Sequence, residues 1–76
     1  MSNTTIHAGA QLELSSGSVA LEISNVGSGS AKYKIIIGGN SQEQTLSGPG
    51  SQQSYENVTY PVEIYNSGPD SIEIAY

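Results

Sequence analysis

The chain has 76 residues, which is enough for one domain, residues 1–76, and too few for a large core, because so short a chain buries only about 60% of its extended surface. Seven acidic residues against two lysines give a net charge of −5, which argues against nucleic acids and anionic membranes as partners. The absence of cysteine excludes disulfides and thiolate metal sites.

The N-terminal stretch MSNTTIHAGA lacks the basic start and apolar core of a signal peptide. No stretch of the sequence approaches the roughly 20 apolar residues that a membrane span needs. We therefore expect no membrane partner. The expected location is the cytoplasm or, after lysis, a released virion, unless the chain is already processed.

Alternation of apolar and polar residues runs through the whole chain, whereas apolar residues do not recur at helical spacing. The alternating runs predict strands at 4–8, 11–15, 18–25, 31–38, 42–46, 52–57, 60–66 and 71–76. Breaks rich in Gly, Ser, Asn and Pro separate them. Such spacing predicts an all-β fold, a small antiparallel β-sandwich of seven to eight strands, Ig-like or jelly-roll-like. The predicted core is Val19, Leu21, Ile23, Ile35, Ile37, Val62, Ile64, Ile72 and Ile74.

Two segments of the chain, LEISNVGSGSAKYKI and VEIYNSGPDSIEIAY, share a pattern at an offset of 41 positions. The matching residues are Glu22, Ile23, Asn25, Gly27 and Ser30 in the first segment and Glu63, Ile64, Asn66, Gly68 and Ser71 in the second. We interpret each copy as a β-hairpin whose loop begins with Asn-x-Gly. Coincidence among common turn residues is the alternative.

The segments LEISNVGSGSAKYKIIIGG and VEIYNSGPDSIEIAY resemble Ig-like β-sandwich modules of bacterial and archaeal surface proteins, which carry a strand ending in Asn-x-Gly before a strand of the A-x-Y-x-I type. The resemblance covers about half of the chain. It implies a domain that presents or spaces other parts and does not catalyse. The chain departs from such modules by being short, free-standing and without a signal, and no functional residue is carried over.

One predicted strand interrupts the alternation, because Ile35, Ile36 and Ile37 are consecutive and give it apolar surface on both faces. A subunit contact that covers Ile36 would remove this surface from water. The first strand, TTIHA, could also add to the sheet edge of a neighbour, with Ile6 in a pocket. We therefore predict Ile6 and Ile36 as subunit contacts of a homo-oligomer.

The sequence offers little for catalysis. His7 is the only histidine, and a Ser-His-acid set with Glu13 would lack the G-x-S-x-G context of an organised nucleophile. The carboxylates are singly spaced, as expected of side chains that keep an outer face soluble. We expect no enzyme activity, no cofactor and no metal.

The leading prediction is a non-catalytic structural or interaction module that acts as a homo-oligomer or with another protein, such as a virion decoration or assembly component. The alternative is a carbohydrate-binding, lectin-like module, because tyrosines beside amides are common on sugar-binding surfaces. Its candidate ligand surface consists of Tyr55, Tyr60, Tyr65, Asn57, Asn66 and Gln53. The absence of Trp, the preferred stacking residue, argues against this alternative.

Overall fold

The computed structural model describes residues 2–76, which form eight β-strands in two antiparallel sheets and no helix. The strands are β1 (Asn3–Ile6), β2 (Gln11–Leu14), β3 (Leu21–Asn25), β4 (Ala31–Ile37), β5 (Asn40–Leu46), β6 (Gln52–Tyr55), β7 (Val62–Pro69) and β8 (Ile72–Ala75). Each predicted strand overlaps one of these. The predicted all-β sandwich is confirmed.

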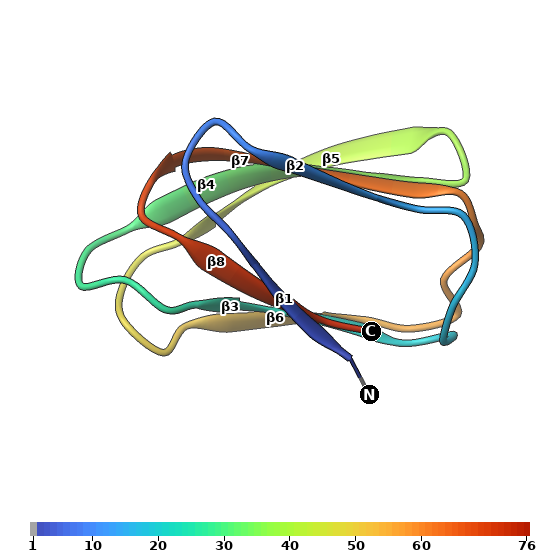
Figure 1. The fold of residues 1–76 in the computed structure, drawn as a ribbon, viewed down its shortest axis with the longest axis horizontal. Coiled ribbons are helices and arrows are strands. Elements are labelled where there is room, and N and C mark those ends of the chain that lie inside the picture. The colour runs from blue at the N-terminus through green and yellow to red at the C-terminus, as the bar shows by residue number, and fades with distance from the viewer. Residues whose placement is uncertain (1) are drawn as a thin grey trace.

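The two sheets lie face to face as the layers of a sandwich (Figure 1). The first sheet has the order β1-β8-β3-β6, and the second sheet has the order β2-β7-β4-β5. The chain pairs as a ribbon folded at the β4–β5 hairpin, since β3 pairs with β6, β2 with β7 and β1 with β8. This is the order of a jelly roll, or double-stranded β-helix. An Ig-like order would place the first two strands in the same sheet.

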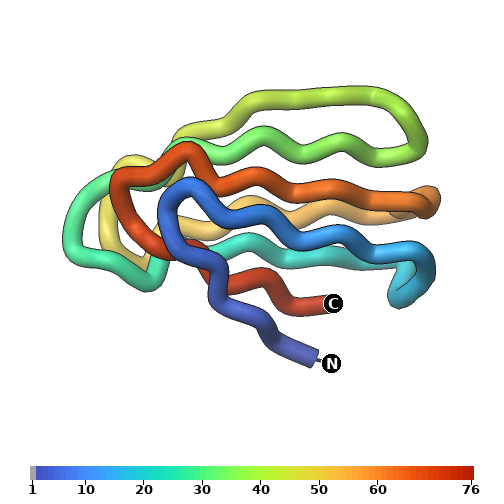
Figure 2. The backbone as a smooth tube through the Cα atoms, turned by 45° about the horizontal axis from the view of Figure 1, so that its top comes forward, coloured from blue at the N-terminus to red at the C-terminus, as the bar shows by residue number. Residues whose placement is uncertain are grey.

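The two ends of the ribbon meet at the edge of the first sheet. The Ser2 amide donates to the Tyr76 carbonyl at 2.7 Å, and the Tyr76 amide donates to the Ser2 carbonyl at 2.8 Å. Figure 2 shows the N- and C-terminal strands side by side, with the β4–β5 hairpin on the opposite side of the molecule. The first strand is therefore an integral part of its own sheet.

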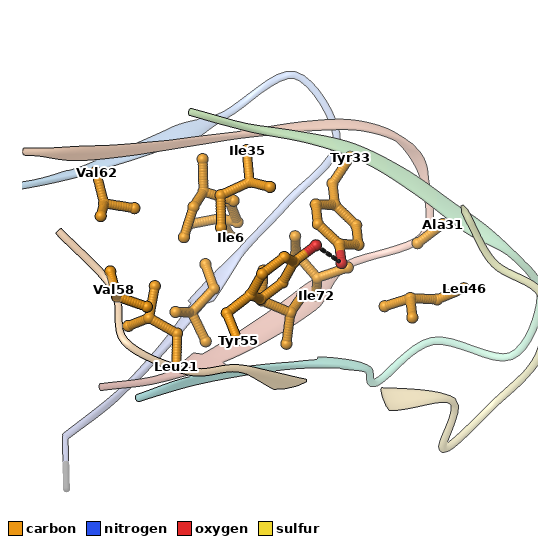
Figure 3. Packing of buried hydrophobic residues seen from close by; sticks show 13 residues of the cluster. Ile6, Leu21, Ala31, Tyr33, Ile35, Leu46, Tyr55, Val58, Val62 and Ile72 are labelled. Atoms are coloured by element: carbon orange, nitrogen blue, oxygen red, sulfur yellow. Dashed lines mark hydrogen bonds between the residues drawn. The ribbon is translucent and has the colours of Figure 1, made fainter. Parts of the chain in front are cut away.

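Buried side chains from β1, from β3 to β8 and from the loop between β6 and β7 fill the space between the sheets (Figure 3). The buried hydrophobic residues are Ile6, Leu21, Ile23, Ala31, Tyr33, Ile35, Leu46, Tyr55, Val58, Val62, Ile64, Ile72 and Ile74. Two residues of the predicted core are not among these buried residues. Val19 is 69% exposed, because β3 begins only at Leu21 and Val19 lies in the loop before it. Ile37 is only partly buried, at the end of β4.

A pair of tyrosines joins the two sheets at the centre of the core. The hydroxyl groups of Tyr33 on β4 and Tyr55 on β6 are 2.7 Å apart and hydrogen-bonded (Figure 3). Burial raises the pKa of both hydroxyls, and the hydrogen bond with Tyr55 raises the pKa of Tyr33 further. The hydrogen bond thus satisfies both hydroxyl groups within the core.

The repeated Asn-x-Gly segments are crossovers from one sheet to the other, which corrects the predicted hairpins. The first copy links β3 to β4, and the second links β7 to β8, so each passes between sheets. The Asn25 side chain accepts from the Gly27 amide at 2.9 Å and donates to the carbonyls of Gly29 at 2.8 Å and Leu46 at 3.2 Å. A buried asparagine therefore shapes the turn from within.

The Asn66 side chain shapes the second crossover in the same manner. It accepts from the Gly68 amide at 2.7 Å and donates to the carbonyls of Asp70 at 2.8 Å and Ile6 at 3.0 Å. The β4–β7 register skips Ser67, a bulge that bends the strand just before the turn. Gly68, at φ +79°, adopts a left-handed conformation that favours glycine.

Candidate interaction surface

The outer face of the second sheet carries an ordered array of side chains that the core does not use. One cross-strand row is Gln11, Tyr65, Lys34 and Glu43; the next row is Glu13, Glu63, Ile36 and Ser41. Lys32 and Thr45 form the start of a third row. These ten residues define what we call the outer face.

Ile36 and Tyr65 give the outer face an apolar centre. Ile36 lies opposite Glu63 on one side and Ser41 on the other, whereas Tyr65 lies between Gln11 and Lys34. Both side chains are only partly exposed. They are diagonal neighbours on β4 and β7, a spacing that an aromatic side chain can bridge.

Charges on the outer face are divided between strands. Both lysines of the chain, Lys32 and Lys34, lie on β4. Glu13 on β2 lies directly opposite Glu63 on β7, an arrangement of like charges that costs stability, and the Gln11 side chain donates to the Glu13 carboxylate at 3.1 Å. An acidic strip of Glu13 and Glu63 thus runs beside the lysines of β4, and Glu43 on β5 lies opposite Lys34 on their other side. A cationic partner over Glu13 and Glu63 would relieve their repulsion.

The outward side of the first sheet is different. By the strand registers, its outward residues are Asn3, Thr5, Glu22, Ser24, Gln52, Ser54, Glu73 and Ala75. It carries no lysine and no apolar side chain larger than Ala75. Of the two sheets, the second therefore presents the surface better suited to a protein partner.

The structure separates the two residues predicted as subunit contacts. Ile36 lies on the outer face, as the run of three isoleucines predicts. Ile6 is 5% exposed and belongs to the core of its own domain, where β1 pairs with β8 and Ile6 lies opposite Ile72. Ile6 is therefore not free to fill a pocket of a neighbour, and that prediction is corrected.

The six residues predicted as a ligand surface do not come together. Tyr55 and Asn66 are buried and hydrogen-bonded within the core. Tyr65 is on the outer face of the second sheet, whereas Gln53 is on β6 in the first sheet. Asn57 and Tyr60 are in the loop between β6 and β7, and the Tyr60 hydroxyl donates to the Ser18 carbonyl at 2.7 Å.

The exposed side chains of His7 and Ser71 make the one serine–histidine contact in the described part of the chain. His7 Nδ1 is 3.0 Å from Ser71 Oγ, and Glu13, the acid considered from sequence, lies on the outer face instead. Residues 2–76 contain no pocket and no group of three or more potential metal ligands. They also contain no helix long and apolar enough to cross a membrane.

The sequence pattern did not lead us to place Lys34, Glu13 and Glu63 on the same face as Ile36. The alternation of β4 was a sufficient signal for the lysine, because Lys32, Lys34 and Ile36 are spaced by two residues and share a face. The acidic pair could not be found in the same way. Its proximity depends on the pairing of β2 with β7, strands almost at opposite ends of the chain.

Fold and surface together define a small jelly-roll domain with one amphipathic outer face. No family model matches the sequence, and no curated protein matches it. The structure is similar to the solution NMR structure of a de novo designed double-stranded β-helix, with a TM-score of 0.56 and 22% sequence identity over 96% of this chain and 90% of the designed one. At this identity the similarity shows the fold alone.

Proposed function

We propose that the protein is a non-catalytic interaction module that self-associates through the outer face of the second sheet, with Ile36 at the centre of the contact. The observation that carries this proposal is the partly exposed Ile36–Tyr65 pair on the two central strands of the second sheet, beside Lys34 on β4 and Glu63 on β7. Apolar area covered by such a contact contributes roughly 25 cal/mol per Å².

A second copy is the partner that the charges favour. If two outer faces pack about a twofold axis that runs diagonally across the sheet through Ile36 and Tyr65, Lys34 of each copy faces Glu13 and Glu63 of the other. The repulsion within each acidic pair is then relieved by cations from the partner. A domain of this size, without disulfides, also gains stability from such association.

Ile36→Lys tests the proposal, because it places a third cation at the centre of the face. We expect the wild-type mass in light scattering at micromolar concentration to exceed that of the monomer, and the variant to have a lower mass. Ile36→Thr, which keeps the β-branch and adds no charge, should weaken association less.

Ala75→Lys supplies the matched control, since Ala75 points outward from a central strand of the other sheet. It adds the same charge and should leave the mass unchanged. Far-UV circular dichroism checks that every variant keeps its β signal. If light scattering shows that the wild-type chain is monomeric at every micromolar concentration measured, the proposed self-association is wrong.

A further inference from the structure

The four sheet edges of the domain differ greatly in length. The edge strands β1, β2 and β6 have four residues each, whereas β5 has seven. The paired residues of β5 contain no Pro and no Lys, and their register with β4 is continuous. Short strands, charged side chains (lysine above all), prolines and bulges are the features that keep sheet edges from pairing with other chains. Of these features β5 has only the single charge of Glu43.

The turn before β5 determines which of its backbone groups are open. Gly38 and Gly39 have φ values of +55° and +87°, as in the two-residue turn of a type I′ hairpin. In such a turn Ile37 and Asn40 form a hydrogen-bonded pair. Because bonded positions alternate in an antiparallel ladder, the N–H and C=O groups of Ser41, Glu43 and Thr45 point away from β4, into the open edge.

We propose that the open edge of β5 binds the β5 strand of a second copy, antiparallel and about a twofold axis, so that two second sheets join into one continuous sheet. This surface is the backbone edge of β5, which is distinct from the outer face. The proposal is based on the length of β5 and on its open backbone groups. If both contacts form, each subunit has two separate twofold interfaces. Copies then associate beyond a dimer, into a closed dihedral assembly where the two axes intersect at a suitable angle and into an open chain where they do not.

Glu43 selects the register of this pairing. Centring the two strands on Glu43 gives the fullest overlap, but it places the two carboxylates directly opposite each other. A shift that centres the pair on Gln42 sets Ser41 opposite Glu43 of the partner; centring on Gln44 sets Glu43 opposite Thr45 of the partner. Either shifted register retains two hydrogen-bonded pairs and brings glutamine amides together across the axis.

Two substitutions at position 43 have opposite expected effects. Glu43→Pro removes an N–H that the β4–β5 ladder does not use, and proline is tolerated on edge strands. Glu43→Gln keeps the N–H and removes the charge. In an Ile36→Lys background, which disables the outer face, we expect Glu43→Pro to weaken residual dimerisation roughly 10-fold or more. We expect Glu43→Gln to strengthen it by about 3-fold.

Cysteine cross-linking locates the contact directly, because the chain has no cysteine of its own. Opposed non-bonded positions of an antiparallel pair lie about 4.5 Å apart at Cα, within the range that a disulfide spans. Mild oxidation should cross-link Gln42→Cys or Gln44→Cys into a dimer, according to the register. Gln53→Cys, exposed on the edge strand β6 of the first sheet, is the matched control and should stay largely uncross-linked.

The substitutions and the cross-linking together distinguish the β5 edge contact from the contact through the outer face. Association that is lost in Ile36→Lys and unaffected by Glu43→Pro, with no cross-link above the Gln53→Cys control, would overturn the edge contact alone. Association that survives Ile36→Lys and is lost with Glu43→Pro would leave the edge as the only contact. A monomer under all conditions would overturn both.

Discussion

Asn25 and Asn66 make the same three hydrogen bonds in two different sheets. Each accepts from the backbone amide two residues ahead, and each donates to the carbonyl four residues ahead. Each also donates to a carbonyl at the end of a distant strand, Leu46 of β5 or Ile6 of β1. The sequence repeat is therefore a structural repeat of two sandwich corners.

Asn66→Ala should be strongly destabilising. It leaves the Gly68 amide and the Ile6 and Asp70 carbonyls without their partner, and an unsatisfied buried group costs about 1–3 kcal/mol. We expect the free energy of unfolding in urea to fall by about 2–4 kcal/mol. Asn3→Ala, on an exposed position of β1, is the control and should change it by less than about 0.5 kcal/mol.

The Tyr33–Tyr55 pair should show strong coupling. Tyr33→Phe leaves the Tyr55 hydroxyl buried without its partner, at a cost of about 1–3 kcal/mol. Adding Tyr55→Phe removes that orphaned group, so the double variant should be no less stable than Tyr33→Phe. A double-mutant cycle by urea unfolding measures this. Purely additive effects would show that the hydrogen bond contributes nothing beyond the packing of the rings.

The same pair should make the fold sensitive to alkali. Burial raises the pKa of Tyr33 and Tyr55, so the folded state keeps protons that the unfolded chain releases near pH ~10. Their contribution to stability is complete below that pH and decreases as the pH rises above it, by up to about 1.4 kcal/mol per pH unit for each hydroxyl. Denaturation followed between pH 8 and pH 12 should show a shallower decline in Tyr33→Phe/Tyr55→Phe.

Strand positions were predictable because their signal is local. Alternation and Gly-rich breaks located every strand, and three consecutive isoleucines placed Ile36 on the outward side of its own. The connections between strands were not predictable. Asn-x-Gly suits a hairpin loop and a sandwich corner equally, and the corner depends on the Leu46 and Ile6 carbonyls, far away in the sequence.

The residues predicted as a ligand surface show the same limit of local sequence signals. Tyr55 and Tyr65 both occur among polar residues, yet Tyr55 points into the core and Tyr65 lies on the outer face. What separates them is the partner strand: Tyr55 pairs with buried Leu21, and Tyr65 pairs with exposed Gln11. A polar strand does not itself reveal which of its faces is covered, so the predicted ligand surface mixed residues from different faces.

Tyr60 should control the mobility of the loop before β3. Its hydroxyl donates to the Ser18 carbonyl at 2.7 Å, and the nearby Val58 amide donates to the Val19 carbonyl at 2.9 Å. The loop otherwise exposes most of its residues, including Val19. Tyr60→Phe removes only the first of these bonds, because the ring stays in place.

The expected loss of global stability in Tyr60→Phe is small, about 0.5–1.5 kcal/mol, since one hydrogen bond near the surface is removed. The loop itself should respond more, with faster exchange of the Ala20 and Val58 amides, which donate to Ser18 Oγ and to the Val19 carbonyl. Proteolytic nicking at Gly17 and Ser18 should also be faster, while strand β4 keeps its protection. Hydrogen exchange followed by NMR resolves these positions. Uniformly accelerated exchange, in β4 as well as in the loop, would mean that Tyr60 supports the whole fold and does not act as a local clamp.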